Sequence, residues 1–157
     1  MRDDINPRVR IVVGETDFDP GAELTALQAR AGGDVGAVAT FIGLVRGGSP
    51  GEPVAALELE HYPGMTERSI ETITGEAARR WPLSDVVIVH RVGRLAPGDR
   101  IVYVQVASGH RPAAFAACEF LMDYLKTEAV FWKRERRPSG DVWIESTADD
   151  AARRSRW

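Results

Sequence analysis

The sequence predicts an α+β fold, a sandwich in which helices pack on a mainly antiparallel sheet. Two observations support this class. Segments with strand-like alternation and segments with helical periodicity follow one another in the order β-α-β-β-α-β-β-α-β-β. No repeat, low-complexity tract or linker interrupts them, and 157 residues suffice to bury a core without metals or disulfides. We therefore expect a single domain over residues 1–157, with mobile ends at 1–7 and 147–157, although Trp157 is a side chain suited to docking.

The first part of the chain is expected to hold three strands and one short helix. Residues 8–13 have the β-branched alternation of a strand, and residues 19–33 form a helix opened by Asp-Pro and closed by two glycines. Residues 36–45 are apolar on both faces, which is typical of a central strand. Residues 46–53 are a loop rich in glycine and proline, and residues 54–62 alternate apolar and acidic side chains as a half-exposed strand does.

The second part begins with an amphipathic helix over residues 65–81. Two apolar strands follow at residues 86–90 and 101–107, with a Pro-Gly-Asp turn just before the second. A strong helix is predicted over residues 112–126. Its inward side chains are expected to be Phe115, Met122 and Leu125, and its polar stripe Glu119, Asp123 and Lys126. The chain then closes with a hairpin made of strands 130–137 and 142–145.

Composition limits the possible functions and locations. The net charge of −3 argues against non-specific binding of nucleic acid, so an anion site must be a local cluster. No apolar stretch is long enough to span a bilayer, and the single cysteine, Cys118, suits the cytoplasm and a buried, inert thiol. His61 and His90 lack metal-ligand spacing, so we interpret both as structural and predict no metal site.

The use of lysine is the most unusual feature of the composition. Of twenty basic residues only two are lysines, Lys126 and Lys133, and the second lies in an arginine-rich run. Arginine stays protonated, whereas a lysine near other cations can lose its proton and act as a nucleophile or base. The alternative is a genome that favours arginine codons, with two surface lysines left over, one of them placed by the helix dipole.

Two further places could bind an anion. His110 and Arg111 lie at the start of the helix beginning at Pro112, where free backbone N–H groups favour a phosphate. Arg46 lies between a strand and a glycine-rich loop, a position suited to holding a ligand. The alternatives are a capping His110 and solvated arginines. The residues alone thus indicate a protein that binds a small phosphorylated ligand, with lysine chemistry nearby.

Five segments, taken in order, resemble the large catalytic subunit of molybdopterin synthase over about Val9 to Trp143: GAVATFIGLVRG, LELEHYPGMTE, VHRVGRLAPGD, SGHRPAAF and MDYLKTEAVFWKRE. The resemblance implies a sulfurtransferase that inserts two sulfurs into cyclic pyranopterin monophosphate (precursor Z) to form molybdopterin. It implies that sulfur arrives as a thiocarboxylate on the C-terminal Gly-Gly of a small ubiquitin-like subunit, in a heterotetramer built on a large-subunit homodimer. It also implies an α/β hammerhead fold with an additional small antiparallel sheet, and no cofactor.

The family's substrate-contacting positions carry over as follows: Leu44, Val45, Arg46, His110, Arg111, Lys126, Lys133, Arg134 and Glu135. The resemblance implies that both lysines are catalytic. We expect Lys126 to act as acid, base or nucleophile, and Lys133 to stabilise the oxyanion or the thiocarboxylate. Leu44 replaces a lysine that the family often has, and residues 146–148 lack an arginine that some members use.

The distance between the two cationic groups leads to one more expectation. Fifteen helical residues separate Arg111 from Lys126, which is about 20 Å of helix axis. A small pterin cannot contact both ends, so His110 and Arg111 are expected to reach the lysines of a second copy. The rival classes are a phosphate-binding regulatory domain without lysine chemistry and an interaction module that docks an acidic partner.

Overall fold

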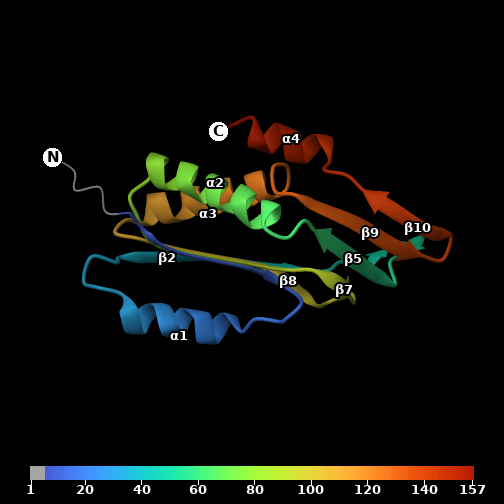
Figure 1. The fold of residues 1–157 in the computed structure, drawn as a ribbon, viewed down its shortest axis with the longest axis horizontal. Helices are drawn as coiled ribbons and strands as arrows, with labels where there is room; N and C mark the ends of the chain where they lie inside the picture. Colours follow the sequence, from blue (N-terminus) through green and yellow to red (C-terminus); the bar gives the residue numbers. More distant parts are fainter. Residues whose placement is uncertain (1–5) are drawn as a thin grey trace.

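The computed structural model describes residues 6–157 and has the α+β architecture expected from the sequence. A four-stranded sheet forms its centre, with one helix on one face and two helices on the other (Figure 1). A second four-stranded sheet continues from one end of this body, and a fourth helix lies near the C-terminus. Residues 1–5 of the expected mobile N-terminal end lie outside the described residues.

The central sheet has the order β1-β6-β8-β2. Its strands are β1 (Arg8–Gly14), β6 (Leu83–Arg91), β8 (Arg100–Ser108) and β2 (Ala37–Leu44). β1 runs parallel to β6, and the other two pairs are antiparallel. The two central strands, β6 and β8, are almost continuously buried, as their apolar sequences require for strands covered on both faces.

The prediction that residues 36–45 form a central strand was wrong, because β2 lies at the edge of the sheet. The strand is apolar on both faces, yet Phe41 and Ile42 are each about two-fifths exposed. An apolar sequence without a neighbouring strand to cover it leaves an exposed hydrophobic edge on the isolated chain.

Helices cover both faces of the central sheet. α1 (Pro20–Arg30) begins at Asp19, whose side chain accepts a hydrogen bond from the N–H of Ala22 at 3.1 Å. α2 (Met65–Arg80) and α3 (Arg111–Leu125) pack together on the opposite face (Figure 1). The main hydrophobic core lies between this helical pair and the sheet.

The second sheet has the order β10-β9-β5-β7 and is antiparallel throughout. Its strands are β10 (Gly140–Ile144), β9 (Phe131–Arg137), β5 (Ala56–His61) and β7 (Gly93–Leu95). The hairpin β9–β10 was expected, whereas the three-residue β7 was not. The loop expected at residues 46–53 contains a minimal hairpin of β3 (Gly48–Ser49) and β4 (Glu52–Pro53).

Two expectations for α3 need correction. Phe115 is 64% exposed rather than inward-facing, because the face of α3 that meets the core carries other residues: Ala114, Ala117, Cys118, Phe120, Leu121 and Leu125. Asp123 was placed on the polar stripe, opposite the inward-facing residues, yet it is only 7% exposed. The C-terminal segment covers it.

That segment also differs from the mobile end expected at residues 147–157. It forms the helix α4 (Ala148–Arg154), capped by the side chain of Thr147, and Trp157 packs beside the main core. The basic tail finds acidic partners on α3, which a periodicity analysis of the tail alone does not reveal.

Candidate active site

Both lysines line one cavity of about 910 Å³, which we call the lysine pocket. Its walls come from the end of β2, the start of β8, the C-terminal end of α3, β9 and residues 144–150. The charged and titratable residues that line it are Arg46, His90, Lys126, Lys133, Glu135, Glu145, Asp149 and Asp150. Segments far apart in the sequence therefore bring cations, carboxylates and one imidazole into a single cavity.

Secondary structure fixes the positions of the two lysines. Lys126 is the C-cap of α3, and its N–H donates to the carbonyl of Met122 at 3.1 Å. The chain then turns and enters β9, where Lys133 pairs with Leu59 of β5. The buried hydroxyl of Thr66 on α2 holds this turn by donating to the carbonyl of Val130 at 2.7 Å. A helix end and a strand thus present both amines to the same cavity.

The amine of Lys133 is electrostatically unusual. Burial and then the charge of the neighbouring Lys126 together lower the pKa of Lys133 from 10.5 to about 8, while Asp150 opposes the shift. Desolvation and a nearby like charge both disfavour the ammonium form. A substantial fraction of Lys133 is therefore an uncharged, nucleophilic amine near neutral pH.

His90 also lines the lysine pocket, a role that its spacing in the sequence did not reveal. The imidazole is 6% exposed, stacks on Phe131 with ring centroids 4.0 Å apart, and donates from Nδ1 to the carbonyl of Arg91 at 2.8 Å. Burial lowers the pKa of His90 to about 3, against the effect of that hydrogen bond. Because a carbonyl can only accept, the neutral ring carries its proton on Nδ1, and Nε2 remains a hydrogen-bond acceptor.

His61, the other histidine interpreted as structural, lies at the end of β5 and not in the lysine pocket. Its Nε2 is 3.8 Å from a carboxylate oxygen of Glu67 on α2. Among residues 6–157 no group of three or more His, Cys, Asp or Glu side chains is arranged to hold a metal ion.

The residues around Arg46 lie at the mouth of the pocket. Val45 is buried and held in place on both sides of its peptide: its N–H donates to Asp99 at 2.9 Å, and its carbonyl accepts from Gly98 at 2.8 Å. Leu44 is 57% exposed and Arg46 is exposed. A hydrogen-bonded backbone therefore carries an exposed cationic side chain, as expected for a group that holds a ligand.

Of the two residues that follow Lys133, only Glu135 lines the lysine pocket. Its carboxylate forms an ion pair with the guanidinium of Arg137 at 2.7 Å. Arg134 points to the other side of the sheet, where it pairs with Glu58 and stacks over the ring of Trp143 at 5.4 Å. Within this chain it links β5, β9 and β10 and does not line the lysine pocket, so its predicted contact with substrate stays a prediction.

His110 and Arg111 lie at the opposite end of α3 from Lys126. Both are exposed, and His110 lines a separate cavity of about 1270 Å³. A single chain therefore does not bring the His110–Arg111 pair and the lysines together, as the length of the helix predicted.

The fold and the lysine pocket define an α+β protein with an amine-bearing binding site. The family model described as MoaE protein matches residues 13–128. The curated molybdopterin synthase catalytic subunit of Salmonella typhimurium is 53% identical over 148 residues, which cover 94% of this chain and 97% of that protein.

Solved structures match the chain over nearly the same length as the curated relative. A molybdopterin biosynthesis MoaE protein from Burkholderia ambifaria superimposes with a TM-score of 0.80 at 55% identity, covering 95% of this chain and 97% of that one. A structure of molybdopterin synthase from Staphylococcus aureus has a TM-score of 0.76 at 29% identity, covering 85% and 95%. The chain belongs to the MoaE protein family. Within the described residues no helix is long and apolar enough to cross a membrane.

Proposed function

We propose that this chain is the catalytic subunit of a molybdopterin synthase and that the lysine pocket is where sulfur is transferred to cyclic pyranopterin monophosphate. The observation that carries the proposal is the half-buried Lys133, whose lowered pKa leaves a free amine beside Lys126 in a cavity of about 910 Å³. That volume suits a small heterocyclic ligand. Family membership and the curated relatives' role support the same reaction.

The geometry favours a division of roles that differs from the one expected from the sequence. Lys133 is the residue suited to act as base or transient nucleophile, because its unprotonated form is populated near neutral pH. Lys126, which is exposed at the C-cap of α3, is suited to hold anionic oxygens of the substrate or of the thiocarboxylate. Arg46 at the pocket mouth adds a third cation.

A complete site requires a second copy of the chain. His110 and Arg111 lie at the far end of α3, so they complete a phosphate-binding site only in the lysine pocket of a partner. The exposed apolar residues of the edge strand β2, together with Phe115 on α3, provide a surface that a homodimer would cover. The proposed assembly is this dimer with one small sulfur-carrier subunit for each chain, whose C-terminal Gly-Gly thiocarboxylate enters the lysine pocket.

The function is tested by supplying the purified protein with precursor Z and a thiocarboxylated small subunit and measuring the fluorescence of oxidised molybdopterin. Lys133→Ala and Lys126→Ala should each abolish or severely reduce product. Arg68→Ala, which removes an exposed cation on α2 outside the pocket, should not. If the unmodified protein forms a stable complex with the small subunit but makes no product, the chain is a docking module and not an enzyme. If the Lys133→Ala variant still makes product, amine chemistry at that position is excluded.

The shared site is tested by subunit mixing. Arg111→Ala and Lys126→Ala homodimers should both be nearly inactive, whereas a mixed dimer contains one pocket with an intact set of residues. Recovery of up to about half of the wild-type activity per mixed dimer is expected, since one of two sites is restored. No recovery, with exchange of subunits verified by tagged copies, would contradict a site shared between chains.

A further inference from the structure

The C-terminal segment, residues 144–157, forms one wall of the lysine pocket, and its last residue, Trp157, packs against the main core. Ile144, Glu145, Ser146, Thr147, Asp149 and Asp150 line the cavity. α4 has no buried residue, so burial of apolar side chains is not what holds it in place. Its position must therefore depend on polar contacts and on the residues that follow it.

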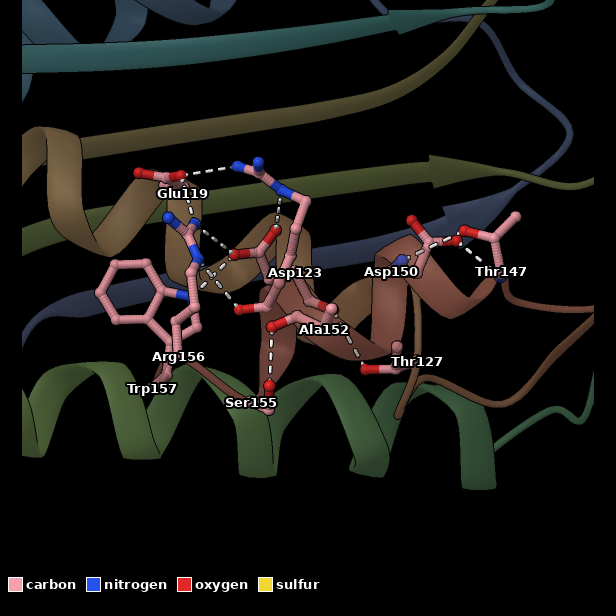
Figure 2. A network of polar contacts seen from close by, with 10 residues as sticks. Glu119, Asp123, Thr127, Thr147, Asp150, Ala152, Ser155, Arg156 and Trp157 are labelled. Atoms are coloured by element: carbon pink, nitrogen blue, oxygen red, sulfur yellow. Dashed lines mark hydrogen bonds and ion pairs between the residues drawn. The ribbon is translucent and has the colours of Figure 1, made fainter.

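Those contacts converge on Asp123 of α3 (Figure 2). Its carboxylate accepts from Nε1 of Trp157 at 2.7 Å, from Nε of Arg153 at 3.2 Å and from Arg156 at 3.4 Å. Glu119, one turn earlier on α3, accepts from the same two arginines at 2.7 Å each. A carboxylate that is 7% exposed and has three charged or N–H donors is a fixed anchor rather than a solvated group.

The last residue of the chain completes the anchor. The indole of Trp157 meets the rings of Trp81 and Phe120 edge-on, with centroids 5.6 and 5.7 Å apart. Its backbone oxygen accepts from Arg80 of α2 at 2.7 Å. We call Asp123, Glu119, Arg153, Arg156 and Trp157 together the C-terminal clamp. It fastens one end of the segment to both α2 and α3.

The other end of the segment directs Asp150 at the lysines. Asp150 and Thr147 form a reciprocal capping box, with bonds of 3.0 and 3.1 Å, which fixes the carboxylate at the start of α4. Burial alone would raise the pKa of Asp150, but the hydrogen bonds from Thr147 and the charges of Lys126 and Lys133 lower it. Asp150 is therefore an anion in the pocket that responds to both amines.

We propose that Asp150 is a positioning residue for the lysine pair and that the C-terminal clamp is the device that holds it there. The anion offsets part of the mutual repulsion of the amines and fixes the pocket wall against which the substrate lies. Release of the clamp opens that wall, admits water to Lys133 and moves its countercharge away. The expected effect of clamp release on turnover rests on the proposed function, whereas its expected effect on the pKa of Lys133 does not.

Three variants separate the contribution of the C-terminal clamp from that of the Asp150 charge. Trp157→Ala removes the anchor and its ring contacts, and Trp157→Phe keeps a ring but removes the N–H donor to Asp123. Asp150→Asn removes only the charge at the pocket. Ser155→Ala is the matched control on the same segment, because its hydroxyl donates to the carbonyl of Ala152 within the tail and, among residues 6–157, to no other group.

Amide hydrogen exchange and the NMR titration of Lys133 test the clamp without reference to activity. In Trp157→Ala, exchange over residues 144–157 should accelerate by about tenfold or more, with a smaller change in Trp157→Phe, as loss of a charge-assisted hydrogen bond implies. The midpoint of Lys133 should fall in Asp150→Asn, where the countercharge is lost. It should rise in Trp157→Ala, because water relieves the desolvation, which is the largest cause of the shift, and this outweighs the displacement of Asp150, which is the smallest. Ser155→Ala should change neither quantity.

In the synthase assay, Trp157→Ala and Asp150→Asn should raise KM for the pterin more than they lower kcat, and Asp150→Glu should restore much of the loss. Faster exchange in Trp157→Ala with unchanged Lys133 midpoint and unchanged KM would overturn the proposal and leave a purely structural tail. The two proposals can fail separately. If the unmodified protein makes no molybdopterin, but the Lys133 midpoint still shifts in the Asp150→Asn variant, the proposed function is refuted and the positioning of the amines is not.

Discussion

The two-lysine composition allows the central electrostatic prediction to be measured directly. The pKa of Lys133 is lowered from 10.5 to about 8, first by burial and then by the charge of Lys126. At pH 7.5 an amine with this pKa is about one-quarter unprotonated, against about one part in a thousand for an ordinary lysine. The pocket therefore increases the population of the reactive form by roughly two hundredfold.

The same shift has a consequence for stability. A depression of about 2.5 pH units corresponds to about 3 kcal/mol by which the fold disfavours the ammonium form. Above pH 10.5 both the folded and unfolded states hold a neutral amine, so no cost remains. Between pH 10.5 and 8 the unfolded chain binds the proton and the folded chain does not, so the free energy of unfolding decreases as the pH falls. Below pH 8 the full cost persists, and Lys133→Met should raise Tm at pH 7 while activity is lost.

The assay is a ¹³C NMR titration of protein labelled at lysine Cε, which contains only two such carbons. Lys133→Arg identifies the Lys133 resonance by its disappearance. Its midpoint should lie near pH 8 and should rise in Lys126→Gln, where one of the causes of the shift is removed. A midpoint above pH 10 in the unmodified, folded protein would refute the reasoning that burial in this pocket activates the amine.

Three other predictions concern the fold that supports the site. Burial keeps His90 neutral down to about pH 3, whereas the unfolded chain protonates it below about pH 6.5. The free energy of unfolding should therefore fall by up to about 5 kcal/mol as the pH falls from about 6.5 to 3. His90→Phe should flatten this part of the acid denaturation curve. Arg30→Ala should cost about 3 kcal/mol in urea unfolding, since it leaves the buried Asp85 without the guanidinium that bonds both its oxygens at 2.8 and 2.9 Å; an unchanged midpoint would contradict this. Gly36→Ala should lower Tm by several degrees, because a Cβ there would lie 2.5 Å from the carbonyl oxygen of Gly109; a neutral effect would show that the loop before α3 yields easily.

Much of the fold could be predicted from the sequence because its strands and helices have strong local periodicity. The apolar runs of β6 and β8 and the amphipathic α2 are examples. The edge position of β2 could not be predicted, since an apolar sequence indicates that a strand is covered and not what covers it. Local patterns also did not indicate α4, whose stability comes from ion pairs with α3 and not from an apolar stripe.

The candidate site shows the same division. Lys126 and Lys133 could be predicted because lysine is rare in this chain, and Arg46 because it lies between a strand and a glycine-rich loop; the structure places all three at one cavity. His90 and Asp150 could not, because each acquires its role from long-range contacts: His90 through the stack with Phe131, and Asp150 through the docking of α4. The chemical type of a residue can be read from the sequence. The neutral state of His90 and the role of Asp150 as a countercharge depend on the groups that surround them in the fold.

A single helix, α3, connects these features. Its start carries His110 and Arg111, its C-cap is Lys126, and Asp123 between them anchors the end of the chain. Its fifteen residues span about 22 Å, which separates the two cationic groups by more than one small ligand can bridge. A shorter helix would allow the site to form within one chain, but it would also place the phosphate-binding cations beside Lys133 permanently. In the proposed dimer a second copy supplies them, and the site is incomplete in the monomer. Catalysis is therefore expected to depend on dimerisation, and activity per chain should fall as the protein is diluted below the dimer dissociation constant.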